Sequence, residues 1–268
     1  MLRLIVRLLA WIPLPFAAAM AWSLSWTWWL VLPIRRRVAV ANLRRAFPQL
    51  PPGPTLRRAV REILLGYTEL LRHFRDPVEI AWEGVDPIRE RHARGQGTVI
   101  IAAHAGSWDL AVAAFPKSQQ VPLSIFVKPP TQPDVAALIE DLRQEAGLFL
   151  LPPDKSMKRA YDALDEGHMV VFTMDQRRNQ GIPVPFFGAP AWTSPAAAAA
   201  HARTGAPVFG CWQWREGIGK HRVRFYGPLE MTGEVEEDTA RLTAWYEERL
   251  RERPHGWLWL HDRWKVPG

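Results

Sequence analysis

Residues 99–110 read VIIAAHAGSWDL, and this stretch decides the fold that the sequence predicts. Residues 99–103 form a short apolar run suited to a buried strand. Gly106 and Ser107 favour a tight turn, and a helix is expected to follow with Ser107 as its N-cap. The stretch therefore predicts a strand, a turn and a helix, with His104 at the carboxyl end of the strand.

The same alternation of strand and helix continues toward the C-terminus. Predicted strands cover residues 123–127, 148–151, 169–174, 208–214 and 223–226, and predicted helices cover 134–145, 156–166, 196–204 and 236–253. This order predicts an α/β fold, with a mixed, mostly parallel sheet flanked by helices. Without internal repeats or a long linker, residues 36–268 are expected to form one domain.

The first segment is predicted to be a membrane anchor, residues 1–35. Residues 8–34 carry no charged side chain and are long enough to cross a bilayer, which takes about 20 helical residues. Pro13 and Pro15 interrupt the segment, so a shallow interfacial helix is an equal alternative. A cleaved signal peptide is a weaker one, because apolar residues continue well beyond the small-residue stretch 19–21.

Arginines flank the apolar segment and predict its orientation. The larger cluster follows it, at residues 35–37 and 44–45, which places the main domain on the cytoplasmic side. Residues 36–47 predict a basic amphipathic helix at the membrane surface. The next predicted helix has Thr55 as its N-cap and an apolar stripe that ends at Phe74.

Composition indicates the charge of the partner but does not identify the class of partner. A net charge of +7 favours an anionic partner, which nucleic acid, an anionic bilayer or an acidic carrier protein can each provide. The 14 tryptophans raise the expectation of a membrane interface. The single cysteine, Cys211, excludes an intramolecular disulfide framework and is predicted to be inert core. The histidines outside the main motif have no metal-like spacing, so no metal or other cofactor is expected.

His104 and Asp109 are the predicted catalytic pair. An imidazole with a pKa of about 6.5 can take the proton of a hydroxyl as that hydroxyl attacks. A carboxylate on the far ring nitrogen would fix the tautomer and stabilise the imidazolium. Backbone N–H groups of the helix start after Gly106 would stabilise negative charge on the thioester oxygen. The alternative is a histidine that ends a strand and an aspartate in a first helical turn, because this five-residue spacing is common.

Five stretches resemble the lipid A biosynthesis acyltransferase family, in the expected order. They are ANLRRAFP (41–48), HAGSWDL (104–110), DQ with IPVPFFGAPAWT (175–176 and 182–193), TGAPV (204–208) and WLWLHDRWK (257–265). The resemblance implies a glycerolipid acyltransferase fold, the His104–Asp109 dyad and an acyl carrier protein or CoA thioester as donor. It also implies attachment to the inner face of the bacterial inner membrane.

Two positions depart from that family pattern. Lys155 stands where the family commonly has an arginine, and a lysine lacks the planar fork of arginine. His255 and Gly256 precede Trp257, where the family usually has a glutamine before its aromatic pair. These departures affect the acceptor and the donor more than the reaction.

The remaining predicted site residues would bind substrate. They are Gly106, Ser107, Lys155, Asp175, Gln176, Phe186, Phe187, Gly188, Thr193, Arg263 and Lys265. The two phenylalanines and Gly188 would line an acyl channel or form a hydrophobic loop on the core. Asp175 would position the acceptor, orient Arg177 or lie in solvent. The tail that starts at Trp257 would grip the membrane interface or form a terminal strand.

The sequence thus predicts an acyltransferase that acts on a hydroxyl of a lipid A precursor or a related anionic glycolipid. Three alternatives remain open. The acceptor can be another bacterial lipid, such as a lysophospholipid, an ornithine lipid or a phosphatidylinositol mannoside. The chain can be a membrane-anchored binding protein without catalysis. Charge alone suggests a nucleic-acid binder, but no nucleic-acid motif supports it.

Overall fold

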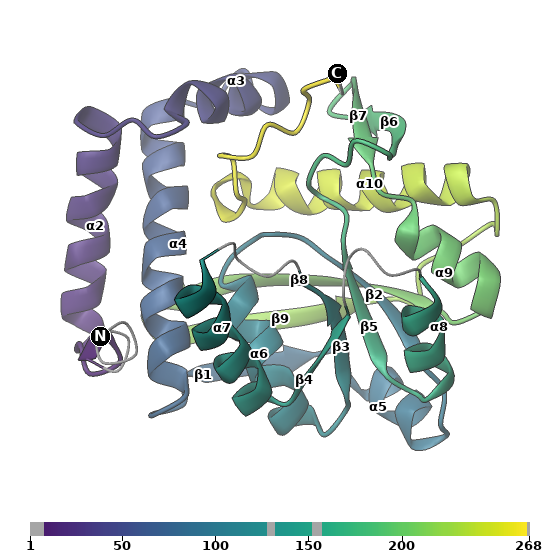
Figure 1. Cartoon of the computed structure of the whole chain (residues 1–268). Helices are drawn as coiled ribbons and strands as arrows, with labels where there is room; N and C mark the ends of the chain where they lie inside the picture. Colours follow the sequence, from purple (N-terminus) through teal and green to yellow (C-terminus); the bar gives the residue numbers. More distant parts are fainter. Residues whose placement is uncertain (1–7, 128–131, 152–156, 267–268) are drawn as a thin grey trace.

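A twisted sheet forms the centre of the molecule in the computed structural model, which describes residues 8–127, 132–151 and 157–266. Within these residues the sheet has seven strands in the order β1-β9-β8-β2-β5-β3-β4 (Figure 1). The strands are β1 (Glu79–Glu83), β2 (Thr98–Ala102), β3 (Leu123–Phe126), β4 (Leu148–Leu151), β5 (Met169–Thr173), β8 (Val208–Gly217) and β9 (Lys220–Tyr226). Neighbouring strands run parallel except β8 and β9, which are antiparallel. The predicted mixed, mostly parallel sheet is confirmed.

Helices cover both faces of the sheet, as a mostly parallel sheet requires. Side chains of β2 alternate between two cores: Val99 and Ile101 face one, and Ile100 faces the other. The first core is closed by α3 (Arg36–Ala46), α4 (Pro52–His73), α8 (Lys158–Asp165), α9 (Ala196–Thr204) and α10 (Val235–Glu252). The second is closed by α5 (Asp86–Ala93) and α6 (Trp108–Gln119). Helix α7 (Pro133–Ala146) packs beside α6.

Several helix ends follow from local chemistry. Gly147 and Gly205 take left-handed backbone conformations after α7 and α9, the usual role of a C-terminal glycine. Helix α10 begins with three acidic residues and ends with two arginines, which complements its dipole. The predicted N-cap Thr55 was wrong, because α4 begins at Pro52, and the Thr55 hydroxyl donates to the Pro51 carbonyl within the first turn.

A small hairpin and an irregular tail lie beyond the sheet. Strands β6 (Ile182–Phe186) and β7 (Ala189–Thr193) form a separate antiparallel pair that packs on α10. The predicted C-terminal strand was wrong. The chain there forms a short 3-10 helix, η1 (Pro254–Gly256), followed by turns. A single bridge between Ala105 and Trp257 ties this tail to the turn after β2.

Two helices pack side by side at one edge of the molecule (Figure 1). Helix α2 (Leu14–Leu30) contacts α4 through a stripe of mostly small buried residues, Ala17, Ala21, Ser25 and Trp28. Helix α3 lies beside the upper end of α4 in the view of Figure 1. Among the helices of the described residues, none combines the length and apolar character needed to cross a bilayer. The spanning form of the predicted anchor is therefore unsupported.

Candidate active site

His104 and Asp175 meet because their strands are parallel neighbours. Ala102 of β2 pairs with Thr173 of β5, and each side chain of interest follows its strand partner by two residues. The two residues therefore leave the same edge of the sheet side by side. This is the carboxyl edge, where open α/β sheets hold ligands.

Asp175 holds the imidazole of His104 at its Nδ1 atom. One carboxylate oxygen lies 2.9 Å from His104 Nδ1, and the other accepts the His104 backbone N–H at 2.9 Å. The indole of Trp257 donates to the same second oxygen at 2.8 Å. Asp175 is only 2% exposed. With Asp175 ionised, His104 carries its proton on Nδ1, which leaves Nε2 as the basic nitrogen.

The pKa values of the pair move in opposite directions, as expected for a histidine beside a carboxylate. Burial lowers the pKa of His104, but the adjacent charge and hydrogen bond of Asp175 outweigh it, so that pKa is raised. Burial raises the pKa of Asp175, but the contacts with His104 and Trp257 outweigh it, and that pKa is lowered. The carboxylate is therefore ionised at neutral pH and stabilises a protonated imidazole.

Asp109 lies in the first turn of α6. Among the described residues the structure gives the His104 ring a hydrogen bond to Asp175 and none to Asp109. The charge of Asp109 still contributes to raising the pKa of His104. Burial raises the pKa of Asp109 itself. Trp108 packs edge-on against the imidazole, with ring centres 5.4 Å apart. The orienting contact that the sequence assigned to Asp109 is made here by Asp175.

The turn after His104 is held by backbone and side-chain bonds on several sides. Gly106 has a φ of 57°, and a Cβ there would lie 2.8 Å from the carbonyl oxygen of Gln213, so glycine is required. The Gly106 N–H donates to the Gly256 carbonyl at 2.7 Å, and the Gln213 amide donates to the Ala105 carbonyl at 2.8 Å. Because the Gly106 N–H already donates to the Gly256 carbonyl, it is not free to bind an oxyanion. The prediction of an oxyanion site stays with the amides further along the start of α6.

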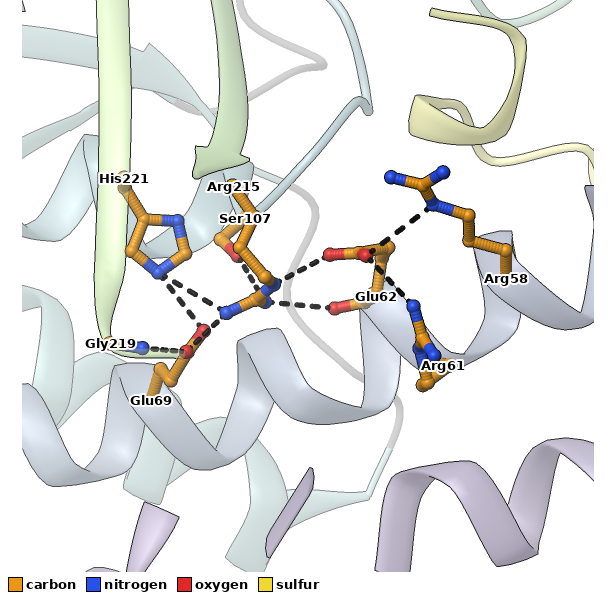
Figure 2. A network of polar contacts seen from close by, with 8 residues as sticks. All are labelled: Arg58, Arg61, Glu62, Glu69, Ser107, Arg215, Gly219 and His221. Atoms are coloured by element: carbon orange, nitrogen blue, oxygen red, sulfur yellow. Dashed lines mark hydrogen bonds and ion pairs between the residues drawn. The ribbon is translucent and has the colours of Figure 1, made fainter. Parts of the chain in front are cut away.

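A buried ion-pair network reaches this turn from α4 (Figure 2). Arg215, at the end of β8, donates to the hydroxyl of Ser107 at 3.2 Å. The same guanidinium pairs with Glu69 and, at 2.5 Å, with Glu62. Ser107 is the N-cap of α6, as predicted, but its hydroxyl makes no capping bond and accepts from Arg215 instead.

Glu69 is the most buried member of the network, with no exposed surface. Its carboxylate accepts the Gly219 N–H at 2.8 Å and lies 3.0 Å from His221 Nε2, in addition to the pair with Arg215 (Figure 2). Burial raises the pKa of Glu69, but the contacts with His221 and Arg215 outweigh it and lower that pKa. Helix α4 is therefore fixed to the β8–β9 turn and to Ser107 by one set of charges.

A narrow apolar cleft opens beside His104 and follows α6. Its cavity volume is about 40 Å³, and Gln213 is the one polar side chain among its lining residues. Ala103, Ala105 and Trp108 lie at the His104 end, and Phe115 lies two helical turns further along. Cys211 lines the wall, and burial raises the pKa of its thiol to about 12, so the thiol is unreactive.

The other predicted substrate-binding residues form a second cluster around the β6–β7 hairpin. Phe186 is buried and stacks on Trp264 with ring centres 5.4 Å apart. Phe187 and Gly188 make the hairpin turn with positive φ angles, and the Phe187 N–H donates to Glu247. Arg263 is buried and donates to Thr193. This cluster adjoins the His104 site through Trp257, whose ring packs against that of Phe186 with ring centres 5.9 Å apart.

The remaining predicted positions do not join either cluster. Gln176 is half-buried next to Asp175, and Lys265 is exposed. Lys155 lies outside the described residues. Within the described residues, the structure contains no group of three or more metal-ligating side chains.

Sequence reasoning missed the partner of His104 and the whole ion-pair network. Asp175 was predicted to position the acceptor, to orient Arg177 or to lie in solvent, although it follows its strand at the same two-residue offset as His104. That shared offset could have indicated that the two residues leave the sheet side by side. The network joins residues about 150 positions apart, such as Glu69 and His221, and no local pattern marks it.

Comparison with known proteins identifies the family that this chain resembles. The profile of the bacterial lipid A biosynthesis acyltransferase family matches residues 2–266. Phosphatidylinositol mannoside acyltransferases from two strains of Mycobacterium tuberculosis (H37Rv and CDC 1551) are each 26% identical over 187 residues. That alignment covers 68% of this chain and 58% of each relative, so the chain spans under two thirds of their length. With nearly its whole length matched, this chain belongs to the bacterial lipid A biosynthesis acyltransferase family.

Proposed function

We propose that this acyltransferase moves a fatty acyl group from a thioester to a hydroxyl of an anionic glycolipid. The observation that carries the proposal is the His104–Asp175 pair beside the apolar cleft along α6, whose lining includes Ala103 and Ala105 on either side of His104. A polar base beside a narrow hydrophobic slot suits a reaction between a water-exposed hydroxyl and a fatty chain.

The proposed reaction uses His104 first as a base and then as an acid. His104 Nε2 accepts the acceptor's hydroxyl proton as the oxygen attacks the thioester carbonyl. The tetrahedral intermediate collapses, the carbon–sulfur bond breaks, and the imidazolium returns the proton to the leaving thiolate. Asp175 holds the ring and stabilises its positive charge between the two proton transfers. Asp109 adds a further negative charge nearby.

The acceptor class is proposed from the relatives and from surface charge. The family is named for lipid A biosynthesis, and the relatives are named for phosphatidylinositol mannoside. Both acceptors are lipids that carry sugar hydroxyls and phosphate. Arg35, Arg37, Arg44 and Arg45 are exposed on and beside α3 and suit such head groups. The donor is an acyl carrier protein or acyl-CoA, and the net charge of +7 suits an acidic carrier.

Mass spectrometry of reconstituted reactions tests this proposal. Purified protein is given a lipid A precursor or a phosphatidylinositol mannoside, each with acyl-CoA and with acyl carrier protein. We expect one acceptor to gain the mass of one acyl chain, and the pairing that reacts names acceptor and donor. Protein-free reactions serve as blanks. If neither glycolipid gains mass with either donor, the proposed acceptor class is wrong.

We further propose that the protein attaches to the cytoplasmic face of the bacterial inner membrane through the outer face of α2. Ala17 and Ala21 face α4, whereas Phe16, Trp22 and Leu24 are about half exposed or more. An apolar helix face next to exposed arginines is typical of an interfacial helix on anionic lipid.

Charged substitutions on α2 are expected to weaken membrane binding. In Phe16→Glu/Trp22→Glu, two large apolar side chains are lost from the proposed lipid contact, so we expect at least about a tenfold fall in partition to anionic vesicles. Vesicle sedimentation measures the partition. Phe149→Glu is the matched control, because Phe149 is similarly exposed but lies on β4. Equal partition of the double variant and the wild type would contradict the attachment.

A further inference from the structure

The apolar cleft beside His104 ends at a second cleft, and Trp82 forms part of the wall of both. The second cleft has a cavity volume of about 440 Å³. Its walls include Phe74, Val78 and Ile80, with Lys117 and Glu145 among its polar residues. Of the residues that line either cleft, Trp82 is the one that they share.

The first cleft runs along α6 from the catalytic end to this shared wall. Trp108, Ala111 and Phe115 line it at helical spacing, which places them on one face of the helix. The seven residue steps from Trp108 to Phe115 correspond to about 10 Å along the helix axis. Trp108 touches the ring of His104, so the near end of the cleft lies at the reacting group.

Aromatic rings close the far end. The indole of Trp82 packs edge-on against Phe115 with ring centres 5.4 Å apart, and Phe115 packs against Phe225 at 5.6 Å. Trp82 is held in β1 by its pairing with Val223 of β9. Ile80 projects to the same side of β1 as Trp82 but lines only the second cleft.

We infer that Trp82 sets the longest acyl chain that the enzyme transfers well, by closing the cleft that holds the chain. This inference rests on the proposed function, because it takes the cleft along α6 as the acyl site. A chain that reaches Trp82 fills the first cleft. A longer chain has to displace the indole, although further apolar wall lies directly behind it in the second cleft.

Removing the indole is expected to lengthen the preferred chain. In Trp82→Ala the two clefts become continuous, so methylene groups beyond the wild-type limit are buried rather than excluded. We expect the ratio of kcat/KM for a thioester two carbons longer than the wild-type optimum, relative to that optimum, to rise about tenfold or more. Competition among saturated acyl-CoA thioesters of increasing length, read by product mass, measures the ratio.

Two further variants make the test specific. Ile80→Ala enlarges only the second cleft, so its chain-length profile is expected to match the wild type. Ala111→Leu fills the first cleft midway, so its profile is expected to shift to shorter chains and to keep activity on them. The Ala111→Leu result tests the same idea from the opposite direction if Trp82→Ala does not fold.

The outcomes separate this inference from the proposed function. A wild-type profile in active Trp82→Ala, or in active Ala111→Leu, overturns the role of Trp82 or of the cleft while acyl transfer itself stands. A wild-type enzyme that transfers no acyl chain to any glycolipid overturns the proposed function. A shift to longer chains in Ile80→Ala equal to that in Trp82→Ala would assign the limit to general loosening of β1 and overturn the inference.

Discussion

Replacing Asp175 with asparagine is expected to lower kcat/KM by about 10⁴-fold, close to the effect of removing the imidazole in His104→Ala. An amide keeps the size of the carboxylate but removes the charge that stabilises the imidazolium. With its oxygen accepting from the His104 N–H and the Trp257 indole, its NH2 group faces Nδ1 and donates to it, which favours the wrong tautomer. Because His104 and Asp175 act as one unit, the double variant should lose little more than either single variant. Steady-state rates on the reactive donor and acceptor measure all three.

The pH dependence distinguishes this role from a loss of structure. The base has to be unprotonated, so kcat/KM of the wild type should fall as pH drops through the raised pKa of His104. In Asp175→Asn the main cause of that raised pKa is gone, and the fall of the residual activity should move to lower pH.

Asp109→Asn is the matched control for the choice of carboxylate. Asp109 contributes charge but no hydrogen bond to the ring, so we expect a loss much smaller than that of Asp175→Asn. A loss in Asp109→Asn as large as in Asp175→Asn, with the pH shift in the former alone, would assign the orienting role to Asp109.

Replacing Arg215 with methionine is expected to cost about 3–5 kcal/mol of unfolding free energy. The side chains of Arg215 and Glu69 are 9% and 0% exposed, so the substitution leaves a buried carboxylate without its main cationic partner. Denaturant unfolding measures the loss. The double variant Arg215→Met/Glu69→Gln should regain part of it, because no unpaired charge remains.

Arg222→Met is the matched control for Arg215→Met. Arg222 lies on the adjacent strand and pairs with Glu83 and Glu216, but these side chains are open to solvent. We expect a much smaller loss of stability, since exposed ion pairs contribute little. Equal losses of unfolding free energy in the two variants would contradict the larger contribution to stability expected of the buried network.

Local patterns were sufficient to predict the elements with regular spacing. The runs at 148–151 and 196–204 match β4 and α9. The strands β1, β6 and β7 were missed. EIAWE lacks a clear alternation, and β6 contains two prolines, which are tolerated in its isolated hairpin because it has no central position in a sheet.

The C-terminal tail shows why alternation alone was misleading. Trp257 and Trp259 alternate as in a strand and are both buried. Their backbone, however, turns repeatedly to bring the indole of Trp257 to Asp175 and the carbonyl of Trp259 to Asn42. Burial of alternate residues was therefore predicted correctly, while the backbone form depended on distant partners.

The candidate site was predictable in part. The position of His104 followed from a strand end, which is local information. Its partner was sought in the nearest carboxylate along the chain, Asp109, whereas the sheet brings Asp175 from 71 residues away. Strand order and register decide that choice, and a single sequence with no alignment does not contain them in readable form.

Helix α4 touches the proposed membrane-facing helix on one side and the catalytic turn on the other. Gly66 lies so close to Ser107 that a Cβ would stand 2.9 Å from its hydroxyl oxygen, and Ala17 and Ala21 let α2 approach from the opposite side. If α2 rests on lipid, this close packing of α2, α4 and the catalytic turn fixes the distance between His104 Nε2 and the bilayer surface. Such an enzyme would select a hydroxyl by its distance from the bilayer surface as well as by its chemistry.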